Sequence, residues 1–231
     1  MSALIYFMQP DTCVLAMDTL AGLMSRGDQP YRRQNTSKFL VLPHLQMVIC
    51  CTGIGNIAWR WGQALLEYGL HGSEIAEVNC YVPEVLRRIA AADDHDFKKP
   101  GQTLTVYHFG YSPSAGRVLG YAYLSPNDFA SEPLQDGMHW KPQDDEVNHL
   151  CQAEAEALMR GKRDVTDLCV NVISVMRAND EARSPEERLN IGGDIHLVVG
   201  GRDEIRMLRI HRFPDAGEPE DQPAAPLEGC Q

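Results

Sequence analysis

Two short apolar segments, separated by a polar turn, open the sequence. Residues 4–8 and 13–17 are almost entirely apolar, and residues 9–12 (QPDT) between them favour a tight turn. The pattern predicts a β-hairpin that begins directly after the first three residues and ends at Asp18. A strand that begins this early holds the amino terminus inside the fold, whereas the termini of most proteins are loosely ordered.

Strand and helix patterns then follow in pairs. Residues 38–42 and 46–52 are predicted strands, and the second is apolar at nearly every position, so both of its faces are expected to be buried. Helical spacing begins at residues 53–69 and returns over residues 73–91, where Pro83 is expected to kink the helix or split it in two. The charged residues that follow predict a loop.

The second half of the chain repeats this alternation. Its last predicted helix has a one-sided apolar stripe with helical spacing, made of Val165, Leu168, Val172, Ile173 and Met176. The other predicted elements of this half are strands over residues 103–110 and 117–124, an irregular stretch over 125–145, a first helix, and strands over 194–200 and 204–213.

The order of elements predicts the fold class. Strands that come in hairpins imply antiparallel sheets, and strands that are apolar on both faces imply sheets covered on both sides. Both demands are met by an α+β fold in which two antiparallel sheets pack together between two helix layers, a four-layer αββα sandwich. Residues 1–213 form this one domain in the prediction, and residues 214–231, rich in Pro and acidic residues, form a disordered tail.

Composition narrows the range of functions. The chain has 21 basic and 32 acidic residues and a net charge of −11, which disfavours nucleic acid and anionic membranes as partners. No apolar run approaches the roughly 20 residues of a membrane span, and the start lacks the pattern of a secretory signal. The seven cysteines include no CxxC pair. These features predict a cytoplasmic protein with reduced cysteines.

Three candidate sites have simpler explanations. Residues 53–58 (GIGNIA) match a dinucleotide fingerprint, but a second helical region follows instead of a strand, so a tight strand-to-helix turn is favoured and NAD binding stays an outside alternative. Residues 93–96 (DDHD) are consecutive and charged, which is typical of a solvated loop rather than a metal site. Cys50 and Cys51 lie in a buried strand, where an activated thiolate is not expected.

The amino terminus is the stronger candidate. Removal of Met1 before a small residue gives Ser2 both a hydroxyl and a free α-amine, whose ordinary pKa of about 7.7–8.0 suits a general base. Lys38, at the start of the third strand, has the charge to keep that amine neutral, and Asp18 is placed to pair with Lys38. Backbone N–H groups of the turn at Thr52-Gly53 are placed to bind an oxyanion.

These residues together resemble the proteasome-type N-terminal nucleophile hydrolases, the family of the proteasome β-subunits, the HslV peptidase and the Anbu proteins. In that family the mature chain begins with a Thr or Ser nucleophile, and an aspartate follows sixteen residues later, as Asp18 follows Ser2. The family lysine opens the next strand, as Lys38 does in TSKFLVL. A Gly-Gly pair before the last hairpin has its counterpart in Gly192-Gly193, and the resemblance covers residues 2–213.

The resemblance implies a self-assembling peptidase. Ser2 would attack an amide bond and form an acyl ester, its α-amine would carry the proton, and no cofactor is implied. The implied partners are a peptide or unfolded-protein substrate, further copies of the chain in a ring or helical assembly, and an ATP-dependent unfoldase.

Two differences from the family leave an alternative open, a catalytically inactive subunit for assembly or binding. Residues 138–142 (MHWKP) stand where the family has a Ser-Gly motif. Residues 186–191 (EERLNI) stand where it has an Asp and a Ser that support the nucleophile, and Glu187 and Asn190 are the candidate substitutes.

Apolar residues in the first helical regions predict self-association. Trp59 and Trp61 point to different sides of one helix, so at least one is expected to face a neighbouring copy. The alternative is that the whole set is buried inside a monomer. The apolar residues of the next helical region are Tyr81, Val82, Val85, Leu86 and Ile89.

Overall fold

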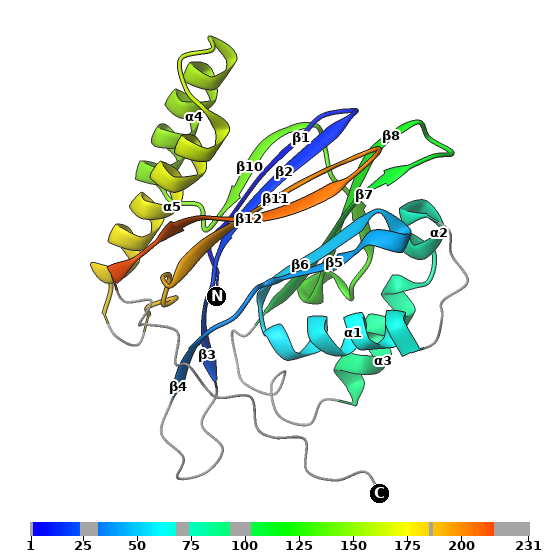
Figure 1. The fold of residues 1–231 in the computed structure, drawn as a ribbon. Coiled ribbons are helices and arrows are strands. Elements are labelled where there is room, and N and C mark those ends of the chain that lie inside the picture. The colour runs from blue at the N-terminus through cyan, green and yellow to red at the C-terminus, as the bar shows by residue number, and fades with distance from the viewer. Residues whose placement is uncertain (1, 24–31, 68–73, 93–102, 185–186, 215–231) are drawn as a thin grey trace, which may run out of the picture.

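A computed structural model describes residues 2–23, 32–67, 74–92, 103–184 and 187–214. Within these ranges the chain has an α+β fold, as the sequence predicts, in which strands of two larger sheets lie among five helices (Figure 1). No helix in these ranges combines the length and hydropathy that a bilayer crossing requires. The predicted loop at residues 93–96 and the predicted tail lie outside the described residues.

The first sheet contains both the beginning and the end of the fold. Its five strands lie in the order β10-β1-β2-β11-β12, and every neighbouring pair is antiparallel. The hairpin of β1 and β2 is central, as expected of strands that are buried on both faces. The bounds are β1 Leu4–Met8, β2 Thr12–Asp18, β10 Gly137–Lys141, β11 Asp194–Gly201 and β12 Ile205–Arg212.

The second sheet is a meander of five antiparallel strands in the order β5-β6-β7-β8-β9. A separate two-stranded ribbon, β3 with β4, extends away from both sheets (Figure 1). The bounds are β3 Leu20–Leu23, β4 Arg32–Asn35, β5 Phe39–Leu42, β6 Met47–Gly53, β7 Leu104–Ser112, β8 Arg117–Leu124 and β9 Ser131–Pro133.

Each sheet is covered by its own group of helices. Apolar residues of α4 and α5 pack against the first sheet, and those of α1, α2 and α3 pack against the second. A third apolar cluster joins side chains of the two sheets, among them Leu4 and Met17 of the first and Cys50 and Tyr107 of the second. The helices are α1 Gly55–Glu67, α2 Ile75–Asn79, α3 Val82–Ala91, α4 Asp145–Met159 and α5 Val165–Glu181.

The structure corrects the predicted element order in two places. The stretch over residues 125–145, expected to be irregular, contains β9 and β10, and β3 and β4 lie in residues 19–37, for which the sequence predicts no element. These strands are short or incompletely buried, so they lack the apolar alternation that marks a strand in sequence. The prediction that Pro83 splits the helical region in two is confirmed. The region forms the separate helices α2 and α3, and Pro83 lies in the first turn of α3.

Candidate active site

The β1–β2 hairpin places the beginning of the chain beside Asp18. Leu4 pairs with Met17 in the ladder, so the residues before Leu4 run past the end of β2. The backbone N–H of Ala3 donates to Asp18 Oδ1 at 3.0 Å. Ser2 is 8% exposed and Asp18 is fully buried. A short hairpin with no extra residue therefore holds Ser2 next to a buried carboxylate.

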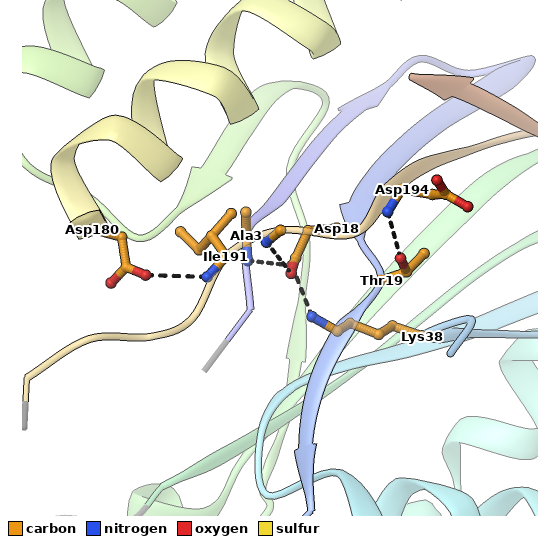
Figure 2. A network of polar contacts seen from close by, with 8 residues as sticks. Ala3, Asp18, Thr19, Lys38, Asp180, Ile191 and Asp194 are labelled. Atoms are coloured by element: carbon orange, nitrogen blue, oxygen red, sulfur yellow. Dashed lines mark hydrogen bonds and ion pairs between the residues drawn. The ribbon is translucent and has the colours of Figure 1, made fainter. Parts of the chain in front are cut away.

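Lys38 reaches the same carboxylate from the other sheet. It lies directly before β5, and its Nζ donates to Asp18 Oδ1 at 2.8 Å, with the two side chains 8% and 0% exposed (Figure 2). Burial raises the pKa of Asp18, and the Lys38 ammonium and the N–H groups of Gly192 and Ala3 oppose that rise. The pair is thus a desolvated ion pair that bridges the two sheets at the head of β1.

The segment before β11 completes the shell around Asp18. The N–H of Gly192 donates to Asp18 Oδ2 at 3.2 Å, and the N–H of Asp194 donates to Thr19 Oγ1 at 2.7 Å. Gly193 between them has a φ of +78°, and an added Cβ would lie 2.5 Å from Thr19 Oγ1. Glycine is therefore required at this position, both for the backbone conformation and for the close approach of the next strand.

Asp180 is a buried carboxylate of this region that the sequence did not single out. It lies in the last turn of α5, is 2% exposed, and accepts a hydrogen bond from the N–H of Leu189 at 2.5 Å. It also accepts one from the N–H of Ile191 at 3.1 Å (Figure 2). These bonds fix the segment that leads into Gly192. One signal was present, because Asp180 lies four residues after Met176 and continues the apolar stripe of the helix.

The two candidate substitutes for the family's supporting residues lie near this segment but have other contacts. Glu187 is exposed and its Oε2 accepts from Ser184 Oγ at 2.9 Å. The Nδ2 of Asn190 donates to the carbonyl of Arg188 at 3.3 Å. Asp180, rather than Glu187, is the buried carboxylate that organises the approach to Gly192.

The predicted oxyanion turn lies at the end of β6, in the second sheet. Gly53 has a φ of +98°, and an added Cβ would lie 1.9 Å from the carbonyl oxygen of Thr103. The start of β5, next to Lys38, pairs with β6, since Phe39 lies opposite Cys50. The turn at Thr52-Gly53 therefore begins two residues after Cys50, the residue that pairs with the neighbour of Lys38. Thr52 is 2% exposed.

The structure removes the context that a dinucleotide site requires. The strand before residues 53–58 is β6, which is antiparallel to both of its neighbours, so no βαβ unit is formed. Glu74, the acidic residue at the start of the next helical region, accepts instead from Ser112 Oγ at 2.6 Å. The turn into α1 is thus a structural turn.

The other chemical candidates are likewise weak. Burial raises the pKa of the Cys51 thiol to about 11, with the Lys38 ammonium opposing it, and raises that of Cys50 well above its usual value. Neither thiol is an activated nucleophile at neutral pH. Within the described ranges, no group of three His, Cys, Asp or Glu side chains is placed to hold a metal ion.

Comparison with known structures matches nearly the whole chain to structures of Anbu, among others. A mutant of Anbu from Hyphomicrobium sp. strain MC1 superimposes with a TM-score of 0.65 and 13% identity, over 91% of this chain and 87% of that one. The fold is that of the Anbu proteins. No protein-family profile matches the sequence, and no curated protein matches it.

Two further Anbu structures extend the match. Another crystal form of Anbu from Hyphomicrobium gives a TM-score of 0.60 at 11% identity, covering 90% of this chain and 87% of that chain. A helical assembly of the Anbu complex from Pseudomonas aeruginosa gives 0.62 at 13% identity, covering 90% and 86%. The sequence-based resemblance to proteasome-type proteins is thus confirmed for the fold, and at these identities the Anbu likeness carries no residue roles.

Proposed function

We propose that the chain is a proteasome-like subunit with a four-layer αββα sandwich, and that Ser2, exposed by removal of Met1, is its nucleophile for amide-bond hydrolysis. The observation that carries this proposal is the buried Asp18, which binds the Lys38 ammonium and the N–H of the residue after Ser2. A buried ion pair seldom adds net stability. The presence of the Asp18–Lys38 ion pair is explained if the reaction at the head of β1 needs a positive charge.

The reaction would proceed in two steps. The Ser2 oxygen attacks the substrate carbonyl while its α-amine accepts the hydroxyl proton, and the N–H of Gly53 stabilises the oxyanion, with Thr52 shaping the turn. Collapse breaks the C–N bond, and the leaving amine takes that proton. Water, deprotonated by the same amine, then attacks the acyl ester. The resulting ammonium returns its proton to the departing Ser2 oxygen, which releases the carboxylic acid and regenerates Ser2 and its free amine.

Lys38 and Asp18 would set the proton affinity of the amine. A nearby ammonium disfavours a second positive charge, so Lys38 lowers the pKa of the Ser2 α-amine and keeps it a base at neutral pH. Asp18 holds Lys38 in place and compensates its desolvation.

A second candidate function is an inactive assembly subunit of the same fold. The observation that favours it is the absence of the family's Ser-Gly motif from β10 and the residue after it, which read GMHWKP. The exposure of Glu187 points the same way, because an exposed carboxylate does not support Ser2.

Self-association through α1 is part of the proposal. Trp61 is fully buried, whereas Trp59 is 52% exposed and Leu66, two helical turns further on the same face, is 58% exposed. The α3 residues expected at an interface pack largely into the core, so α1 carries the exposed apolar surface. Ring or helical assembly, a peptide or unfolded-protein substrate and an ATP-dependent unfoldase complete the proposal.

Intact-mass measurement and activity assays test the nucleophile. We expect a mass lacking Met1 and hydrolysis of peptide amides that Ser2→Ala abolishes and Ser2→Thr retains. Retention of Met1 on all molecules would instead support the inactive subunit. Light scattering tests the assembly, and a mass near the 25.8 kDa of one chain would refute it.

A further inference from the structure

A second lysine lies close to the head of β1. Lys141 is the last residue of β10 and pairs with Leu4, two residues after Ser2. Leu4 and its other neighbour, Met17, both belong to the cluster between the two sheets. Because directly opposed residues of a sheet point to the same face, Lys141 also points between the sheets.

The Lys141 side chain crosses to the second sheet. Its Nζ donates to Thr105 Oγ1 on β7 at 3.2 Å. Thr105 pairs with Thr52, the last residue before the Gly53 turn. The ammonium thus lies in the space bounded by the start of β1 and the end of β6, the two places from which the proposed site is built.

No described residue provides a counter-charge for this ammonium. In the part of the chain that the structure describes, the polar contact of Lys141 is a neutral hydroxyl, and no carboxylate forms an ion pair with it. Lys141 is only partly exposed, and burial lowers the pKa of its ammonium. A partly buried cation without a counter-charge costs free energy, so stability does not explain the lysine.

We propose that Lys141 is a positioning residue of the Ser2 site, where its ammonium, together with Lys38, disfavours protonation of the Ser2 α-amine. This inference rests on the proposed function and deepens it. Lys141 belongs to the MHWKP segment that replaces the family's Ser-Gly motif. In this chain, the neighbourhood of the amine would therefore contain a charge in place of a hydroxyl.

Among the described residues, Lys141 is the cation at this space that has no carboxylate partner. Lys38 is paired with Asp18, so the Asp18 carboxylate offsets part of the effect of Lys38 on the amine. His196 lies opposite Met17, on the side of Met17 away from Leu4. Burial raises the pKa of Tyr107 to about 12 and lowers the pKa of His196, so both side chains are neutral near pH 7.

The expected size of the effect follows from the spacing. Ser2 lies two strand residues before Leu4, about 7 Å along the chain. A charge within roughly 10 Å in a partly solvated site shifts a pKa by about half a unit to one unit. Removing the Lys141 charge should raise the α-amine pKa by that amount.

The test measures the α-amine pKa directly. The Ser2→Ala protein, released from a cleavable tag so that it begins at residue 2, is labelled with trace acetic anhydride across a pH series, and its terminal peptide is quantified by mass spectrometry. Lys141→Met and Lys141→Gln remove the charge, Lys141→Arg keeps it, and Lys162→Met removes an exposed lysine as a matched control.

The outcomes separate a charge effect from a packing effect. We expect both neutral variants to raise the α-amine pKa by about half a unit to one unit, and Lys141→Arg and Lys162→Met to leave it unchanged. An unchanged pKa in the neutral variants, or an equal rise in Lys141→Arg, would overturn the proposal. The readout needs no turnover, so an inactive wild-type protein would refute the proposed function without affecting this result.

Discussion

The two ends of the paired sheets each bury a carboxylate, and they satisfy it differently. Asp18, at the Ser2 end, binds the Lys38 ammonium and two backbone N–H groups. Glu74, near the opposite end of β7, accepts from Ser112 Oγ at 2.6 Å and from the N–H of Ser114 at 3.2 Å. Among the described residues, no cation pairs with Glu74.

The difference shows what each end needs. At the Glu74 end the donors are neutral, and the hydrogen bonds from Ser112 and Ser114 lower the pKa of Glu74, so a carboxylate can tie a helix start to a β-turn without a lysine. At the Ser2 end burial raises the pKa of Asp18 despite a buried ammonium. The cost of burying a lysine there supports the proposal that the Ser2 site uses its positive charge.

The largest expected effect is that of Lys38→Met. It leaves Asp18 buried without its cation, which should lower the free energy of unfolding by about 3–5 kcal/mol and abolish hydrolysis. Ser112→Ala at the other end should cost about 1.5–3 kcal/mol and leave turnover unchanged. Urea unfolding and a peptide assay measure both variants, and full turnover in Lys38→Met would show that the two ends do not differ in function.

A double variant separates charge from stability. Asp18→Asn with Lys38→Met removes both charges, and it should recover most of the lost stability because no buried ion is left unpaired. Hydrolysis should not recover. If activity returned with stability, the ion pair would serve only the fold.

Gly193→Ala tests whether the backbone near Asp18 is packed more tightly than an ordinary glycine turn. Its φ of +78° and the 2.3 Å approach of Asn35 Oδ1 to an added Cβ should together cost about 3 kcal/mol. Gly116 is the matched control, since its φ is +65° and an added Cβ meets nothing within 4 Å. Gly116→Ala should cost about 1 kcal/mol, and equal losses in thermal or urea unfolding would contradict the packing argument.

Asp180→Asn tests the support of the Gly192 segment. An amide side chain offers one oxygen, so one of the two N–H groups of Leu189 and Ile191 loses its acceptor, at about 2 kcal/mol. We expect turnover to fall because the Gly192 N–H that binds Asp18 is displaced. Glu181→Gln, on the same helical turn but exposed, is the control. Unchanged turnover in Asp180→Asn would make this carboxylate purely structural.

The sequence predicted most strands of the two larger sheets but missed β9 and β10. The strands β1, β2 and β6 were found because they are apolar at almost every position. The short strands β9 and β10 were missed because neither alternates between buried and exposed positions, whereas the mostly exposed edge strand β12 was predicted because a Gly-Gly turn joins it to β11. Their existence depends on pairing with distant strands, which local pattern does not encode.

The same limit applies to the site. Ser2 and Asp18 are brought together by one short hairpin, which the sequence pattern predicts. Lys38 reaches Asp18 from the other sheet, after β3 and β4, and it was the family resemblance that pointed to this lysine. Lys141 approaches the head of β1 only through the register of β10 with β1. That register joins segments more than a hundred residues apart and was not accessible from the sequence.

The smallest expected effect is a difference in acid sensitivity between the two carboxylates. Glu74 has a folded-state pKa below its ordinary 4.5, so its stabilising contribution is present above pH 4.5 and is lost as the pH falls through the folded value. Asp18 has a folded-state pKa above its ordinary 3.8, so protonation of Asp18 favours the folded state as the pH falls toward 3.8. The stability difference between wild type and Glu74→Gln should therefore shrink on acidification from pH 6 to pH 3.5, while that between wild type and Asp18→Asn moves in favour of the wild type. Urea unfolding across this range measures both differences, and parallel slopes for the two variants would remove the distinction between the two ends.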